Sequence, residues 1–173
     1  MQLPVLSLPI VSDRLLLRRT LCFEADTYYE LHTDNDYITY IGEPISRERF
    51  DAQFAKELSD APTGLSLAVT LRNSGAVIGE LMLLPSTDHE VELIIALLPR
   101  YRGEGYAFEA AKTAVTAIFA DTQISAVIAC VEDAHVASLH MVEALGMTFM
   151  GRTERLGGKK PKVFSIKRPA PSV

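Results

Sequence analysis

The segment from residue 91 to residue 120 constrains the fold most, because a strand pattern passes through two glycines into the clearest helical pattern of the chain. Residues 91–98, VELIIALL, are typical of a buried strand, and apolar residues recur at helical spacing from Gly105 to Ala120. At the junction, Gly103 and Gly105 permit backbone angles and a close approach that a Cβ would block. Successive N–H groups can then converge on an anion at the positive end of a helix dipole. The junction predicts an anion-binding turn, to which Arg100 and Arg102 add charge suited to phosphate, although a plain strand-to-helix turn also explains two glycines.

Two better-known phosphate motifs do not fit these residues. A Walker A loop needs Lys and then Ser or Thr after its last glycine, but Tyr106 and Ala107 follow Gly105. A dinucleotide fingerprint needs Gly or Ala at position 108, which is Phe108. Both nucleotide-binding classes are therefore excluded on sequence.

The remaining patterns predict one mixed α/β domain over residues 1–173, with a frayed tail at 169–173. Hydrophobic residues make up 48% of the 173 positions, which is enough for a sizeable core. Seven strands are predicted, at 13–20, 65–71, 76–84, 91–98, 125–131, 147–152 and 162–168. Helices are predicted at 24–35, from a Ser46 cap through Leu58, at 105–120 and at 135–145 before Gly146.

Charge and cysteine usage exclude several classes of function. A net charge of −5 gives no long-range attraction for nucleic acid or for anionic lipid. Cys22 and Cys130 form no disulfide framework and no zinc-type spacing. No export signal is evident and no apolar run approaches 18 residues, so we expect a cytoplasmic protein without a membrane segment.

The glycine junction and its surroundings resemble a known family. The run RYRGEG from Arg100 to Gly105 resembles the Q/R-x-x-G-x-G/A signature of the GNAT superfamily of N-acetyltransferases. The longer stretch from Glu92 to Ala110 is similar to that motif in the branch of the RimJ and RimL ribosomal-protein N-terminal acetyltransferases. The segments DRLLLR (13–18) and ALGM (144–147) also match that branch. The resemblance spans residues 13–166.

This resemblance implies a fold and a co-substrate. The fold is a mixed, mostly antiparallel sheet of six or seven strands with about four helices, open between the fourth strand (91–98) and the fifth (125–131). The co-substrate is acetyl-CoA, whose acetyl group passes to a primary amine. The backbone of residues 102–107 would bind the pyrophosphate, and the strand end would pair with the pantetheine arm. The cofactor-binding residues expected are Ile95, Ala96, Leu97, Arg100, Arg102, Gly103, Glu104, Gly105, Tyr106, Ala107, His135 and Ser138.

The catalytic base is expected at Glu92. An α-amine has a pKa near 8 and a lysine a pKa near 10.4, so a general base assists attack at neutral pH. The family often places this base at the head of the strand that carries the cofactor, where this chain has Glu92. Glu90 and His89 are alternative candidates for the base. The other possibility is that Glu92 faces solvent on a short strand and has no catalytic role. The run HEVEL (89–93) lacks the second histidine of HExxH, so no metal site is expected.

The acid that assists the thiolate is harder to assign. Many family members place a tyrosine where this chain has Val142, whereas the ribosomal-type branch has a serine four residues earlier, matched by Ser138. A helix serine bonded to a preceding carbonyl is equally common. His135 stands where the family usually has an asparagine that contacts the cofactor. Glu104 also departs from the pattern, because its charge opposes that of a pyrophosphate unless the side chain points outward.

The acceptor side is expected near residues 36–48. Tyr37, Tyr40, Glu43 and Glu48 would line an amine-attracting pocket there, or the segment is an aromatic loop that packs on the sheet. The acceptor is a protein N-terminus or a small-molecule amine, and a longer acyl chain than acetyl remains open. The departures at positions 104, 135 and 142 keep a second hypothesis, a non-catalytic acyl-CoA-binding or interaction module. The apolar final strands are compatible with a homodimer.

Overall fold

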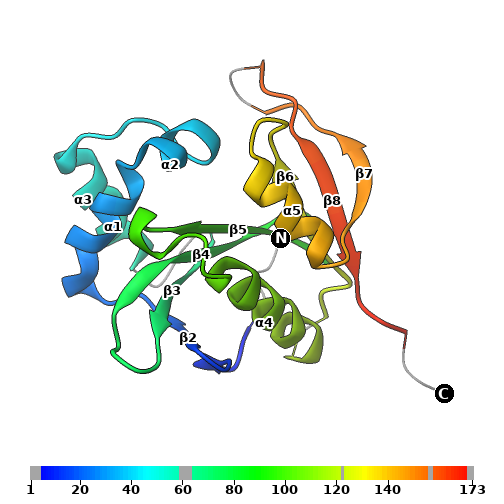
Figure 1. Cartoon of the computed structure of the whole chain (residues 1–173), viewed down its shortest axis with the longest axis horizontal. Coiled ribbons are helices and arrows are strands. Elements are labelled where there is room, and N and C mark those ends of the chain that lie inside the picture. The colour runs from blue at the N-terminus through cyan, green and yellow to red at the C-terminus, as the bar shows by residue number, and fades with distance from the viewer. Residues whose placement is uncertain (1–4, 59–63, 122, 156–157, 171–173) are drawn as a thin grey trace.

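The computed structural model describes residues 5–58, 64–121, 123–155 and 158–170. These residues form one eight-stranded sheet in the order β1-β2-β3-β4-β5-β6-β8-β7 (Figure 1). Neighbouring strands are antiparallel except β5 and β6, which are parallel. The strands are β1 (Ile10–Val11), β2 (Leu15–Arg19), β3 (Leu65–Leu71), β4 (Val77–Pro85), β5 (Glu90–Leu97), β6 (Ala126–Val131), β7 (Thr148–Arg152) and β8 (Lys162–Lys167).

Helices cover both faces of this sheet. They are α1 (Ala25–His32), α2 (Asn35–Tyr40), α3 (Arg47–Glu57), α4 (Tyr106–Asp121) and α5 (Val136–Ala144), with two 3-10 turns, η1 (Cys22–Glu24) and η2 (Pro99–Tyr101). Leu67 and Val69 of β3 belong to the core under α4, whereas Ala68 between them packs with Phe50 and Phe54 of α3. Because side chains alternate along a strand, α4 and α3 lie on opposite faces. In Figure 1, α1, α2 and α3 accordingly gather apart from α4.

The sheet opens between β5 and β6. Only Glu90, Val91 and Glu92 of β5 pair with β6, opposite Ala126, Val127 and Ile128. Beyond that point the two strands separate, while β5 stays paired with β4 as far as Leu97 and β6 stays paired with β8 as far as Val131. The opening predicted between these two strands is therefore confirmed.

Two elements differ from the sequence-based expectation. All seven predicted strands are present, and β1 is an eighth, too short at two residues to give an alternation pattern. The helix predicted over 24–35 ends at His32, and a separate helix, α2, begins at Asn35, because the Asp34 side chain accepts hydrogen bonds from the N–H groups of Asp36 and Tyr37 and so caps it. Of the predicted frayed tail, residues 171–173 lie outside the described residues, and Pro169 and Ala170 are exposed without secondary structure.

Candidate active site

Two cavities meet at the opening between β5 and β6. The loop cavity, about 540 Å³, is lined by the turn before α4, the end of β5 and one side of α5. The Glu92 cavity, about 590 Å³, is lined by Glu92, the segment after α2, the end of β6 and the chain before β8. Both cavities share one set of lining residues: Tyr40, Ile41, Ile95, His135, Ser138 and Met141. A ligand in one cavity can therefore reach a ligand in the other.

The turn before α4 that contains Gly103 and Gly105, called the glycine turn below, has the geometry expected of an anion site. Gly103 and Gly105 have φ angles of +82° and +78°, in the left-handed region that favours glycine. The Glu109 N–H donates to the Gly105 carbonyl, which starts the helical ladder, so the N–H groups of residues 106–108 have no intrahelical partner. Gly103, Gly105, Tyr106, Ala107 and Phe108 all line the loop cavity. Glu104 is exposed and is not among the residues that line it.

The two arginines of the turn have partners that sequence did not predict. Arg100 forms an ion pair with Glu30 of α1 and is not among the lining residues of either cavity, so its contact with a phosphate stays a prediction. Arg102 lines the loop cavity, but its guanidinium bonds Asp34 at 2.5 Å and Asp36 at 2.6 Å. Burial raises the pKa of Asp34, but Arg102 and the backbone N–H groups of Tyr37 and Asp36 together outweigh burial, so this pKa lies below its usual range. Arg102 therefore ties the turn to α2.

The end of β5 contributes an open strand edge to the loop cavity. Ile95, Ala96 and Leu97 line that cavity, and on their side away from β4 no strand of the described part of the chain pairs with them. One of the backbone groups is already used, because the Leu97 carbonyl accepts a bond from Arg102 Nε at 2.9 Å. The edge is nonetheless open to an extended chain over the preceding residues.

Glu92 lies at the point where β5 and β6 separate. Its side chain is buried, and both of its carboxylate oxygens accept from Nη2 of Arg155 at 2.5 Å. The same nitrogen lies 3.1 Å from Sγ of Cys130, and burial raises the pKa of that thiol. Glu92 thus faces the cavity rather than solvent, whereas His89 and Glu90 are not lining residues of either cavity.

An aromatic stack spans the opening. The Tyr40 ring of α2 lies 4.1 Å from the His135 ring at the start of α5, with an interplanar angle of 6°. Burial lowers the pKa of His135, with Arg102 acting in the same direction and Asp36 against it. Ser138 lies one turn further along α5. The polar side chains common to both cavities are therefore Tyr40, His135 and Ser138.

Comparison with protein families agrees with this geometry. A model of the acetyltransferase (GNAT) domain matches residues 14–148. The chain belongs to the GNAT family. No curated protein matches the sequence at a significant level. Solved structures of low sequence identity share the fold of this GNAT protein.

Three of those structures indicate the range of the similarity. A GNAT-family acetyltransferase from Bacillus anthracis has a TM-score of 0.83 at 21% identity, covering 93% of this chain and 99% of its own. Spermidine N-acetyltransferase from Vibrio cholerae, solved with CoA and spermine, has a TM-score of 0.78 at 17% identity, covering 91% and 97%. Ribosomal-protein-S5-alanine acetyltransferase from Vibrio fischeri has a TM-score of 0.75 at 16% identity, covering 94% and 97%.

The segment expected to receive the acceptor divides between the two cavities. Tyr40 and Glu43 line the Glu92 cavity, whereas Tyr37 is buried against His32 and lines the loop cavity. Glu48 is exposed at the start of α3 and is not among the lining residues. Val142, at the position where the family often has tyrosine, is fully buried in the core beneath α5.

Three sets of contacts in the site are not predicted from the sequence. They are the pair of Arg155 with Glu92, the bonds of Arg102 to Asp34 and Asp36, and the stacking of Tyr40 on His135. Each depends on contacts between residues far apart in the chain.

Within the described residues, no helix is long and apolar enough to cross a membrane. The same residues contain no group of three or more His, Cys, Asp or Glu side chains placed to hold a metal ion.

Proposed function

We propose that this GNAT protein transfers the acetyl group of acetyl-CoA directly to a primary amine, either a protein N-terminal α-amine or the amine of a small molecule. The observation that carries the proposal is the meeting of the two cavities at Tyr40, His135 and Ser138. A thioester that enters through the loop cavity and an amine that enters through the Glu92 cavity come together there. The structural relatives named for spermidine and for a ribosomal protein support an amine acceptor.

The loop cavity fits the co-substrate. The unpaired N–H groups at the start of α4 suit the pyrophosphate, since they lie at the positive end of the helix dipole. The open edge of β5 suits the amide-bearing pantetheine arm, which can bond to backbone groups as an added strand does. Ser138 and His135 then lie along the path from the pyrophosphate turn to the junction.

The Glu92 cavity fits a cationic acceptor at its entrance. Glu43 and Glu132 line it and attract a protonated amine. The positive charge of Arg155 is balanced by Glu92, and Lys159 donates to the Thr39 carbonyl at 2.8 Å. The two cationic side chains of this cavity are thus already engaged with the protein.

The chemistry assigned to these groups is direct acyl transfer. Glu92 accepts a proton from the acceptor amine, directly or through water, as the amine nitrogen bonds to the thioester carbon. Each carboxylate oxygen has two lone pairs, so Glu92 can do this while it stays bonded to Arg155. The carbon–sulfur bond then breaks, and the sulfur leaves as the thiolate of CoA, which accepts a hydrogen bond from the Ser138 hydroxyl. The thiolate takes a proton from water to become the free thiol, and Glu92 returns the proton it accepted to solvent.

The test is release of free CoA thiol from acetyl-CoA with a panel of amines. We expect Glu92→Gln to lower kcat about 100-fold, because it removes a general base, and Ser138→Ala to lower it about ten-fold, because it removes one hydrogen bond to a charged group. Glu90→Gln is the matched control, since Glu90 is on the same strand but away from both cavities, and its turnover should equal that of wild type. Unchanged turnover in both Glu92→Gln and Ser138→Ala would refute these roles.

A second hypothesis, a non-catalytic acyl-CoA-binding or interaction module, is favoured by Val142, His135 and Glu104. It shares the prediction of CoA binding and differs in releasing no thiol with any amine.

We further propose a cytoplasmic location, which the free cysteines Cys22 and Cys130 support. Phe149 and Met150, exposed on the edge strand β7, support a homodimer.

A further inference from the structure

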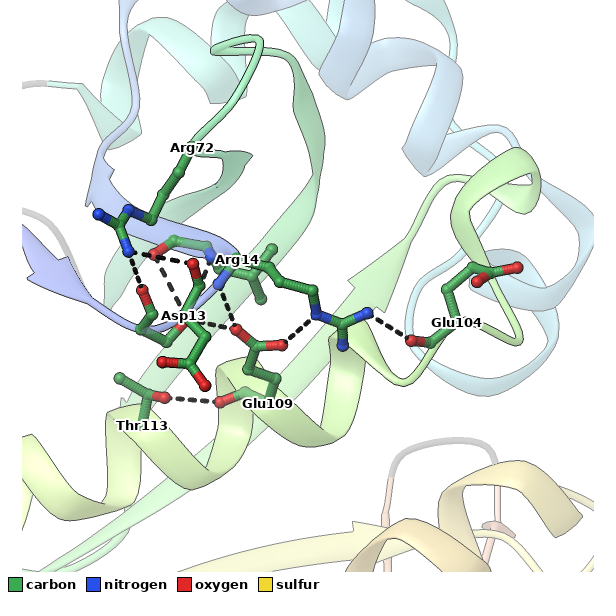
Figure 2. Close-up of polar contacts among 8 residues, drawn as sticks. Asp13, Arg14, Arg72, Glu104, Glu109 and Thr113 are labelled. Atoms are coloured by element: carbon green, nitrogen blue, oxygen red, sulfur yellow. Dashed lines mark hydrogen bonds and ion pairs between the residues drawn. The ribbon is translucent and has the colours of Figure 1, made fainter.

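Arg14 reaches the glycine turn from the other end of the chain. It stands in the turn between β1 and β2, and its side chain extends to the start of α4 (Figure 2). Nη1 donates to the Glu104 carbonyl at 3.0 Å, and Nε donates to Oε2 of Glu109 at 2.6 Å. The guanidinium also lies over the Tyr106 ring, 4.4 Å from its centroid. One side chain thus contacts Glu104 in the turn and both Tyr106 and Glu109 in the first turn of α4.

Glu109 holds Arg14 in this place. Besides the ion pair, its Oε1 accepts from the backbone N–H of Arg14 at 2.8 Å and from the Ser12 hydroxyl at 2.7 Å. Burial raises the pKa of Glu109, but these bonds outweigh it and bring the pKa below its usual range. Glu109 belongs to the first turn of α4, where an unpaired carboxylate would repel a bound phosphate. Pairing with Arg14 neutralises that charge and fixes the guanidinium beside the turn.

The bond from Arg14 to the Glu104 carbonyl sets the direction of one backbone donor. In a planar trans peptide the C=O and N–H bonds point to opposite sides. Because the Glu104 carbonyl is directed at Arg14, the N–H of Gly105 in the same peptide is directed away from Arg14. Gly105 lines the loop cavity, and its φ of +78° lets the chain adopt this peptide orientation.

We propose that Arg14 is a positioning residue for the pyrophosphate of acetyl-CoA, holding the Glu104–Gly105 peptide so that the Gly105 N–H faces the anion before it binds. The proposal rests on the proposed use of acetyl-CoA. Arg14 acts through the peptide and through Glu109, and its own guanidinium stays on the outer side of the turn. Orientation in advance strengthens binding because no order is lost when the anion arrives.

The test compares two acetyl donors in wild type and Arg14→Gln. The first donor is acetyl-CoA, and the second is S-acetylpantetheine, which keeps the thioester and pantetheine but lacks the pyrophosphate. We expect Arg14→Gln to raise the Kd of CoA, measured by calorimetry, about ten-fold, since a bond to a charged group is misdirected. The kcat/KM with S-acetylpantetheine should equal that of wild type.

Arg72→Gln is the matched control. Arg72 grips the same β1–β2 turn through the carbonyls of Ser12 and Asp13, at 2.8 and 3.0 Å, but makes no contact with the glycine turn in the described structure (Figure 2). Its affinity for CoA should match that of wild type. Glu109→Gln should weaken CoA binding, and the Arg14→Gln/Glu109→Gln double variant should lose less than the product of the two single effects, because the pair acts as a unit.

Three outcomes would overturn the positioning role: equal CoA affinity in wild type and Arg14→Gln, an equal loss in Arg72→Gln, or an equal loss with S-acetylpantetheine. The last two would show that the variant disturbs the fold in general. If wild type itself binds no CoA, the proposed function fails, which is a separate result. Arg14 is 46% exposed, so its variants are expected to fold, and their thermal unfolding midpoints check this.

Discussion

At the residue scale, Glu80 is the most deeply buried carboxylate of the described residues. Its side chain is 1% exposed, and its two oxygens are used by Nε2 of His32 at 3.0 Å and by the Ser66 hydroxyl at 2.6 Å. A buried carboxylate is tolerated only when it is paired and hydrogen-bonded. The His32 ring also stacks on Tyr37 at 4.2 Å, so this pair supports α2 from beneath.

Replacing His32 by leucine should therefore leave Glu80 buried with one partner. We expect the free energy of unfolding to fall by about 3 kcal/mol, the usual cost of breaking a buried pair, in urea denaturation at neutral pH. Asp51→Asn is the control, because its pair with Arg47 lies on the surface and is worth about 0.5 kcal/mol or less. Equal losses in the two variants would contradict this account of Glu80.

At the element scale, α2 lines both cavities, as α5 does. Tyr40 at the end of α2 lines both cavities. Arg102 links the start of α2 to the glycine turn through ion pairs with Asp34 and Asp36. The arrangement places the Asp36 carboxylate on the wall of the loop cavity, beside the expected path of an anionic ligand. The Arg102 guanidinium, which could otherwise bind a phosphate, is bonded to two carboxylates instead.

Asp36→Asn should strengthen CoA binding rather than weaken it. The change removes a like charge and frees part of Arg102, and we expect the Kd to fall about three-fold at low salt, as for a single surface charge contact. The gain should shrink at 500 mM salt, where screening is strong. Glu48→Gln removes a carboxylate from α3, away from the cavities, and should leave the Kd unchanged. A higher Kd in Asp36→Asn would mean that the direction Asp36 gives to Arg102 matters more than its charge.

At the scale of the whole molecule, the sheet consists of two blocks joined by a short parallel contact. Three residue pairs link β5 to β6, and the Glu92–Arg155 and Tyr40–His135 contacts bridge the opening beside them. A ligand in the loop cavity touches β5 and α4 on one side and α5 on the other. Binding should therefore stabilise the contact between the two blocks of the sheet.

Acetyl-CoA at 100 times its Kd should raise the thermal unfolding midpoint by about 5–10 °C. Mass action supplies about 2.7 kcal/mol at that concentration, and about 2–4 °C accompanies each kcal/mol in a chain of this size. Differential scanning fluorimetry measures the shift, with ATP and NAD as comparisons that carry phosphates without a pantetheine arm. A shift from ATP or NAD as large as that from acetyl-CoA would count against the assigned co-substrate.

Local patterns explain why so much of the fold could be predicted from sequence. Alternation predicts the strand at 13–20, a continuous β-branched run predicts the strand at 125–131, and Gly103 and Gly105 predict the turn, because these features depend on near neighbours. The new helix at Asn35 had a local signal, the Asp34 cap, that was not used. By contrast, Arg14 with Glu109, Arg155 with Glu92 and Arg102 with Asp34 join residues 63 to 95 positions apart. Such partners depend on the folded sheet, which is why the arginines nearest the glycines were assigned to phosphate.

The strand order has a consequence for how the molecule is made. Each pairing from β1 to β5 joins strands that are neighbours in the sequence, and α4 packs on this block. In a nascent chain the strands β1 to β5 and α4 can therefore meet before residues after 125 leave the ribosome, although the core under α4 is complete only when Val127 of β6 joins it. Strands β6, β7 and β8 then pair with one another and dock along three residues of β5. On this order of events the binding opening is the last part of the molecule to form, and translation must pass α5 before any ligand can be held.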